Sequence, residues 1–138
     1  MLPTSCACSK LRRSARIVSA IYDEALAPSG LSVAQFALLR MLERAGPCSL
    51  SALAEASALD RTTLNRNLRP LQESGLVVSA DCTEDQRARI VQLSDDGRAA
   101  IRGAEPHWRA AQARIDAALG SERETLFRIL DRVEALRG

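Results

Sequence analysis

The stretch DQRARIVQLSDDG at 85–97 constrains the fold more than any other part of this 138-residue chain. Charged residues crowd its first five positions, and the apolar-rich run Ile90–Leu93 follows them. A short β-branched run indicates a strand, whereas Ser94 followed by two aspartates indicates the first turn of a helix. The sequence therefore predicts a strand that begins next to two arginines and an aspartate and leads directly into a helix.

A second strand is expected just upstream. LVVSA at 76–80 is short and β-branched, and it is the natural antiparallel partner of ARIVQL at 88–93. The connection between them, 81–87, is nearly all polar and is too long for a tight hairpin turn. The two segments therefore predict a two-stranded ribbon with a polar tip.

A helix is expected immediately before this ribbon. Asp60 stands where an N-cap belongs, RTTLNRNLRPLQESG follows it, and Gly75 suits the position just past a helix end. Pro70 inside this pattern predicts a kink or a weakened turn, because it donates no backbone hydrogen bond.

Apolar residues spaced by three and four predict the other helices. Ser32 and Ser49 can cap a second and a third helix, and Gly120 breaks the long helix that starts at Ser94. The predicted order is four helices, two strands, a long helix and a final helix. The first helix carries the stripe Leu11, Ala15, Val18, Tyr22 and Leu26. The chain is thus expected to form one domain, 1–138, mainly α with a small β-wing.

The helix after Asp60 has the features of a major-groove reader. Its expected outward face combines hydroxyl, amide and guanidinium groups near the N-terminus, which can contact base edges and phosphates. The preceding segment SLSALAEASALD has the right length for a positioning helix and a turn, although that turn lacks the usual glycine. An ordinary solvated helix face is the alternative. The candidate contact residues are Arg61, Thr62, Asn65, Arg66 and Arg69, opposite the apolar Leu64, Leu68 and Leu71.

The ribbon would then act as a wing beside this helix. Arg87 is the natural minor-groove probe, since narrow A·T grooves attract arginine. Asp85 carries the wrong charge for DNA, and its expected role is to orient Arg87 by a charge-assisted hydrogen bond. These residues extend the predicted DNA-binding lobe over 49–93.

Charge placement matters more here than bulk charge. The formal net charge is only +2, and 49–93 holds five arginines against six acidic residues. Specific DNA binding would therefore depend on where the arginines lie. The helices at 10–27 and 95–137 lie at opposite ends of the chain, and their apolar stripes suggest pairing with a second copy.

The run DQRARIVQLSDDG resembles the wing motif of MarR-family regulators, which reads Asp, any residue, Arg, a short strand, Leu-Ser/Thr and Gly. LDRTTLNRNLRPLQESGLV resembles that family's recognition helix and its exit into the wing, and the resemblance covers nearly the whole chain. It implies a winged helix-turn-helix homodimer that binds a palindromic operator in double-stranded DNA, usually released by a small molecule or an oxidant. The DNA contacts implied by position are Thr62, Thr63, Asn65, Arg66, Asp85 and Arg87.

The cysteines are candidates for sensing. Cys6 and Cys8 are either reduced thiols on a frayed terminus or a thiol switch or soft-metal site, with basic neighbours that favour thiolate. A metal site would need Cys48, Cys82 or a second protomer to complete its ligands. Cys82, near the wing tip, could disturb the wing when oxidised, whereas Cys48 is expected to be a small packed residue.

Three aromatic side chains are candidates for the wall of a ligand pocket. Trp108 is expected to pack in the core or at a dimer contact, with Tyr22 and Phe36 as further wall candidates. An apolar or aromatic effector would fit such a lining.

Several functional classes are disfavoured. No G-x-S-x-G, H-E-x-x-H, phosphate-loop or dinucleotide motif occurs, and a single His leaves little for acid–base catalysis, so we expect no enzyme and no cofactor. The N-terminus lacks the apolar segment of a signal peptide, and no apolar run reaches membrane-spanning length, which favours a cytoplasmic protein. A winged-helix module that binds proteins rather than DNA is the alternative function.

Overall fold

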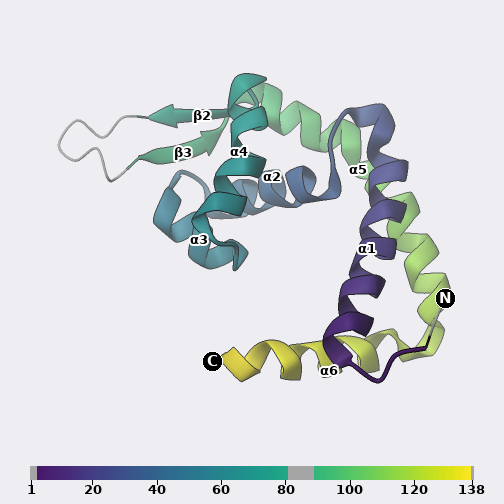
Figure 1. Cartoon of the computed structure of the whole chain (residues 1–138). Helices are drawn as coiled ribbons and strands as arrows, with labels where there is room; N and C mark the ends of the chain where they lie inside the picture. The colour runs from purple at the N-terminus through teal and green to yellow at the C-terminus, as the bar shows by residue number, and fades with distance from the viewer. Residues whose placement is uncertain (1–2, 81–88, 138) are drawn as a thin grey trace.

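The computed structural model describes residues 3–80 and 89–137. Nine helical elements and three strands follow one another in the described chain (Figure 1). The mainly helical class with a small sheet is confirmed. The order is α1 (Ala7–Leu26), η1 (Ala27–Ser29), α2 (Val33–Ala45), β1 (Cys48–Ser49), α3 (Leu50–Ser57), α4 (Arg61–Glu73), β2 (Val77–Ala80), β3 (Ile90–Leu93), α5 (Asp95–Leu119), η2 (Gly120–Glu122), α6 (Arg123–Glu134) and η3 (Ala135–Arg137).

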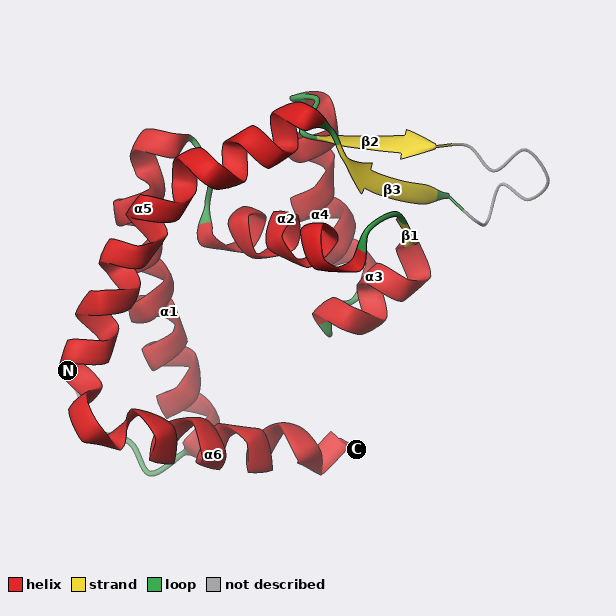
Figure 2. Cartoon of the chain, turned by 180° about the vertical axis from the view of Figure 1, so that it is seen from behind, coloured by secondary structure: helices red, strands yellow, loops and turns green. Residues whose placement is uncertain are grey.

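The chain forms two lobes that share α5. The α2, α3 and α4 helices and the sheet make one lobe, while α1, α6 and the C-terminal half of α5 make the other (Figure 1). α5 bends along its length as it passes from one lobe to the other (Figure 2). Pro106 lies inside α5 and supplies the cause, because proline removes one helical hydrogen bond and crowds the preceding turn.

The lobe formed by α2, α3, α4 and the sheet is called the winged lobe below. Its core is built around α2. Phe36, Leu39 and Leu42 of α2 are almost fully buried. Burying such a side chain stabilises a fold by about 1.5–3 kcal/mol. The core also contains residues of α3, α4, both longer strands and the start of α5, namely Leu53, Leu64, Leu68, Leu71, Val77, Val91, Leu93, Ile101 and Ala104.

The sheet has three strands rather than the two that the sequence predicts. Its order is β1-β3-β2, and both pairings are antiparallel. The predicted pairing of β2 with β3 is confirmed, with Val77 opposite Leu93. β1 was missed because it has two residues, Cys48 and Ser49, too few to show an alternating pattern.

Three predicted helix starts are confirmed at atomic detail. Ser32 and Gln35 form a reciprocal capping box at α2, in which each side chain accepts the backbone N–H of the other residue. Ser49 accepts the Ala52 N–H at α3, and Ser94 accepts the Gly97 N–H at α5. Gly75 follows the end of α4 with a φ of 78°, as expected for the residue after a helix.

The start of α5 is fastened to the end of α4. The Ser94 N–H donates to the Leu76 carbonyl at 3.0 Å, and the Ser94 Oγ donates to the Gly75 carbonyl at 2.5 Å. Gly97 is buried against the same segment, so that an added Cβ would overlap the Leu76 carbonyl oxygen. The Ser-Asp-Asp-Gly run thus fixes the long helix onto the winged lobe.

The second lobe is held together by polar contacts around α5. Tyr22 of α1 donates its hydroxyl hydrogen to Gln112. Arg123 of α6 pairs with Asp116 at 2.6 Å, and its guanidinium lies 4.2 Å from the Phe127 ring centroid. Burial, followed by the negative charge of Asp116, raises the pKa of Tyr22. These contacts join α1 and α6 to α5.

Much apolar surface in this lobe is nevertheless open. No residue of α6 is buried in the described chain. Exposed positions include parts of the stripe expected on the first helix, so that stripe is only partly buried within the chain. The large exposed apolar side chains of α1, α6 and η3 are Leu11, Ile17, Val18, Phe127, Ile129, Val133 and Leu136.

Candidate nucleic-acid interface

Two side-chain caps position α3 and α4. Ser49 Oγ accepts the Ala52 N–H at 3.1 Å, and Asp60 Oδ1 accepts the Thr63 N–H at 2.7 Å. The backbone hydrogen bond from Thr63 lowers the pKa of Asp60, so its carboxylate stays charged at the positive end of the helix dipole. The N-terminus of α4 is therefore fixed by a local interaction.

In the turn between α3 and α4, an alanine adopts the left-handed conformation that glycine usually adopts. Ala58 has a φ of 56°, the left-handed region that an L-residue occupies at a cost of about 1–2 kcal/mol. Its N–H donates to the Glu55 carbonyl at 3.3 Å. Ser57 donates its hydroxyl to the Ala54 carbonyl and accepts the Leu59 N–H. The turn thus keeps helix-turn-helix geometry without its usual residue.

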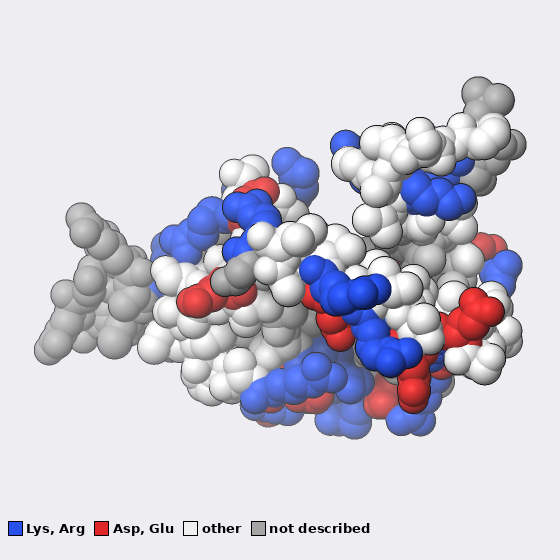
Figure 3. Space-filling view, turned by 90° about the horizontal axis from the view of Figure 1, so that it is seen from below, with Lys and Arg blue, Asp and Glu red and all other residues white. Residues whose placement is uncertain are grey.

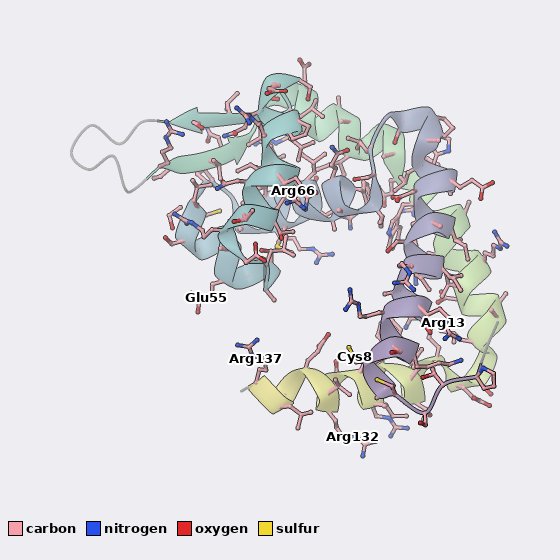
Figure 4. All side chains as sticks on the ribbon, in the orientation of Figure 1. Cys8, Arg13, Glu55, Arg66, Arg132 and Arg137 are labelled. Carbon is pink, nitrogen blue, oxygen red and sulfur yellow. The ribbon has the colours of Figure 1, made fainter. Side chains whose placement is uncertain are left out.

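α4 presents two chemically distinct faces. Leu64, Leu68 and Leu71 are buried, as predicted. Of the candidate contacts on α4, Thr63 is half-buried, whereas Arg61, Thr62, Asn65, Arg66 and Arg69 are exposed. Figure 4 shows Arg66 on α4 and Glu55 on α3 of the same lobe.

Arg61 and Arg69 each contact another polar side chain of the described chain. Arg61 Nη1 lies 3.5 Å from Ser51 Oγ on α3. Arg69 Nε lies 3.5 Å from Glu73 in an exposed ion pair.

Pro70 does not end the helix, because α4 continues to Glu73 and Ser74 donates to the Pro70 carbonyl. The expected interruption is confined to the hydrogen bond that proline cannot donate.

The wing is described only at its base. Gln72 of α4 donates to Ser79 of β2 at 3.1 Å, which ties the ribbon to the recognition helix. Asp85 and Arg87, the predicted probes, and Cys82 lie outside the described residues.

Charge is mixed rather than uniform over the described surface. Lysine and arginine side chains alternate with aspartate and glutamate over the face in Figure 3. This agrees with the near balance of charges in the sequence, so the placement of single arginines decides what the protein can bind.

The structure separates the cysteines. Cys6 and Cys8 are exposed at the start of α1, whereas Cys48 is half-buried on β1 of the other lobe. Hydrogen bonds with the Ser9 side chain and backbone lower the pKa of Cys6, while burial raises the pKa of Cys48. The described residues hold no group of three His, Cys, Asp or Glu side chains suited to a metal ion.

A depression of about 250 Å³ lies between α2 and α5. Phe36 and Trp108 line it, with ring centroids 6.0 Å apart, whereas Tyr22 is not among its lining residues. Tyr22 instead packs 6.4 Å from the Trp108 ring. The structure therefore brings two of the three aromatic candidates, Phe36 and Trp108, to this wall.

Arg40 is the lining residue that sequence reasoning missed. Its guanidinium lies 5.8 Å from the Phe36 ring centroid, and its Nε is buried without a hydrogen bond among the described residues. Glu43 is 3.8 Å from Nε, too far for a hydrogen bond, and Glu105 lies 3.7 Å from Nη1. The four-residue spacing of Phe36, Arg40 and Arg44 was the available signal.

No single described helix is both long and apolar enough to cross a membrane. Only the segments Ala7–Ser29 and Val33–Ala45 taken together reach that length and composition, and they are bent by 75° relative to each other.

The two capped helices, the turn and the ribbon define a winged helix-turn-helix protein. The MarR family model matches residues 31–88. The HTH-type transcriptional repressor Rv2887 of Mycobacterium tuberculosis is 33% identical over 104 residues, which are 75% of each chain. The chain belongs to the MarR family, and its relatives are transcriptional regulators rather than enzymes.

Solved structures agree with this assignment. The M. tuberculosis regulator MosR in complex with DNA is 36% identical, with a TM-score of 0.81 over 97% of this chain and 100% of that one. Bordetella bronchiseptica BpsR, whose DNA binding is regulated by 6-hydroxynicotinic acid, is 25% identical, with a TM-score of 0.85 over 98% of both chains.

Proposed function

We propose that this protein is a transcriptional repressor that binds a palindromic operator in double-stranded DNA as a homodimer. The observation that carries the proposal is the exposed set Thr62, Asn65 and Arg66 on a helix whose opposite face is buried and whose N-terminus is capped by Asp60. The DNA complex of MosR and the repressor Rv2887 support the same reading.

Each α4 side chain has a role that follows from its chemistry. Arg66 can form two hydrogen bonds with a guanine edge, and Asn65 can pair with adenine. Thr62 can contact a thymine methyl group or a phosphate, while the Thr63 N–H donates to the capping carboxylate of Asp60. Arg61 and Arg69, each with a protein partner, suit phosphates at the edges of the contact.

The wing would supply a second contact. Arg87 would enter a minor groove beside the major groove that holds α4, and Asp85 would orient it. The lobe at 49–93 would thus carry all base recognition in one protomer. We expect Arg87→Ala to lose affinity mainly on operators with A·T-rich flanks.

Dimerisation would use the regions 10–27 and 95–137. The open apolar side chains of α1 and α6, including Leu11, Val18, Phe127 and Val133, support this proposal because they stay exposed to solvent among the described residues. A closed dimer with twofold symmetry would bury the same patch on both copies and present two α4 helices to the two half-sites.

Release from DNA has two candidate triggers. The first is oxidation of Cys6 and Cys8, whose exposure and lowered Cys6 pKa favour reaction. The second is a small ligand in the depression between α2 and α5, where Phe36 and Trp108 would contact an apolar body and Arg40 an acceptor atom. Cys82 remains a third thiol candidate at the predicted wing.

The first test is binding to DNA from upstream of the protein's own gene, measured by fluorescence polarisation across a salt series. We expect tight, salt-dependent binding of the reduced protein, and a loss of about tenfold or more in Arg66→Ala. Arg102→Ala removes an exposed charge from α5 and should bind like the parent. Repeating the titration after mild oxidation separates a thiol trigger from a ligand trigger.

A winged-helix module that binds other proteins is the alternative function. It is favoured if neither that upstream DNA nor a genome-wide selection of DNA fragments yields a specific site.

A further inference from the structure

The first turns of α1 carry a basic face beside the cysteine pair. Ser9, Arg12, Arg13 and Arg16 follow the spacing that places side chains on one face of a helix, and they line a depression of about 350 Å³. Arg12 and Arg16 are exposed, and neither is among the ion pairs of the described residues. Their positive charges are therefore available to an anion from solution.

Ser9 connects this basic face to a nucleophile. It forms hydrogen bonds with Cys6 that favour the thiolate, and it also lines the depression. Cys8 is exposed two residues further along. Thiolate, not thiol, attacks a disulfide, so the Ser9 hydrogen bonds link a reactive sulfur to a residue of the basic face.

We propose that this face binds low-molecular-weight disulfides that carry carboxylates, and that Cys6 reacts with them by thiol–disulfide exchange. The inference rests on the thiol-triggered release proposed above and names its co-reactant. Guanidinium groups bind carboxylates through paired hydrogen bonds, so Arg12 and Arg16 would concentrate an anionic reagent beside the thiolate. Neutral and cationic disulfides would gain no such attraction.

The exchange balances in two steps. The Cys6 thiolate attacks one sulfur of the bound disulfide, a new S–S bond forms, and the reagent's own S–S bond breaks. One half leaves as a thiolate and takes a proton from water. The Cys8 thiolate then attacks Cys6 Sγ and expels the second half. The two cysteines lose two electrons, and the reagent gains them as it becomes two thiols.

The second step would open the first turn of α1. Cys6 is the extended N-cap residue of α1, and Cys8 lies in the first turn of that helix. A disulfide between them needs Cβ atoms about 3.5–4.5 Å apart. In the structure the Cys6 carbonyl accepts the Lys10 N–H at 3.0 Å, and the Cys6 N–H donates to Thr4 Oγ1 at 3.1 Å. Closing the Cys6–Cys8 bridge would break the first of these bonds.

The basic face is separate from the apolar residues that we assign to dimerisation. Leu11 and Val18 are seven positions apart and share one face of α1. Arg12 and Arg16 lie about a quarter of a turn or more around the helix from these residues, because successive positions rotate by about 100°. Arg12 and Arg16 therefore lie off the face of α1 that carries Leu11 and Val18.

The test compares three reagents on the full chain, with Cys8→Ser present so that the Cys6 adduct cannot resolve. The reagents are oxidised glutathione, which is anionic, 2-hydroxyethyl disulfide, which is neutral, and cystamine, which is cationic. Mass spectrometry of the Cys6 peptide gives each initial rate. The ratio to the neutral reagent cancels any change in thiolate content.

We expect Arg12→Ala/Arg16→Ala to lower the ratio of the glutathione rate to the neutral rate by about fivefold at low ionic strength. Arg102→Ala, an exposed arginine of α5, is the matched control and should leave the ratio unchanged. The cystamine ratio should rise in the double variant. Circular dichroism verifies that each variant is folded.

An unchanged glutathione ratio in the double variant would overturn the proposal. A parent ratio that is insensitive to salt up to about 1 M would do the same without any substitution. DNA binding of the reduced protein is measured separately. A protein that binds its operator without charge selection at Cys6 loses only this inference, whereas charge selection without DNA binding contradicts the proposed function.

Discussion

Gly97, in the first turn of α5, lies directly against the backbone carbonyl of Leu76, which follows α4. The same carbonyl accepts the Ser94 N–H, so backbone rather than a flexible side chain occupies the space where a Cβ would go. The glycine at the end of the DQRARIVQLSDDG run is therefore required by the packing of α5 against the segment that joins α4 to β2.

We expect Gly97→Ala to lower the free energy of unfolding by about 1–3 kcal/mol, because α5 must move away from Leu76. Gly103→Ala in the same helix is the control, since an added Cβ meets no atom within 4 Å there. The control should raise stability by about 1 kcal/mol through helix propensity. Urea unfolding measures both, and equal stability of the two variants would contradict the packing argument.

The left-handed Ala58 gives a prediction of the opposite sign. Ala58→Gly should raise the free energy of unfolding by about 1 kcal/mol, since glycine adopts a φ of 56° without steric strain. Ala56→Gly, two residues earlier and inside α3, should lower it by about the same amount. If thermal unfolding shows Ala58→Gly to be no more stable than the parent, the turn is not strained.

Arg66 and Arg69 should fail in different ways. Arg66→Ala should lower affinity and relax base preference at one operator position, because we propose that its guanidinium contacts a base edge. Arg69→Ala should weaken binding evenly across sequences and reduce the salt slope by about one, as for a lost phosphate contact. Binding titrations on single-base operator variants distinguish the two. Identical affinity profiles for the two variants would contradict the assignment of Arg66 to a base and Arg69 to a phosphate.

The exposed face of α6 predicts a dimer that a single charge can break. Val133→Asp should convert the protein to a monomer, because a carboxylate would lie in the proposed apolar interface. Glu134→Arg changes the charge at the adjacent exposed position and should leave the dimer intact. Sedimentation velocity measures both. A dimeric Val133→Asp would place the interface elsewhere.

The two described thiol environments predict a difference in reactivity with pH. Hydrogen bonding from Ser9 lowers the pKa of Cys6, so its alkylation by iodoacetamide should accelerate below the ordinary thiol range. Burial raises the pKa of Cys48, so its reaction should need higher pH. Ser9→Ala should move the Cys6 profile toward higher pH and leave Cys48 unchanged. Coincident profiles in the parent would refute the assignment.

Much of this fold could be predicted because local signals agree with tertiary packing. Ser32, Ser49, Asp60 and Ser94 cap helices through their own side chains, so each start is encoded within a few residues. The recognition helix was predictable for the same reason, since its leucine spacing separates buried from exposed positions.

Other features depend on distant parts of the chain and left no local signal. β1 exists because β3 pairs with it, and two residues cannot encode that partner. Arg40 lines the depression beside Trp108 and lies close to Glu105, and both of these residues belong to α5, far along the sequence. Tyr22 was assigned to the pocket by residue type, whereas its bond to Gln112 holds it between α1 and α5.

The bent α5 has a consequence for the spacing of the DNA that a dimer can read. Its first half is packed into the winged lobe through Ile101 and Ala104, and its second half is bound to α1 and α6. In a dimer the distance between the two α4 helices would thus be set by the length and bend of one helix. Half-sites lie about 34–36 Å apart when they are one helical turn from each other. The bend at Pro106 would then help to determine which half-site spacing the two α4 helices of a dimer can span.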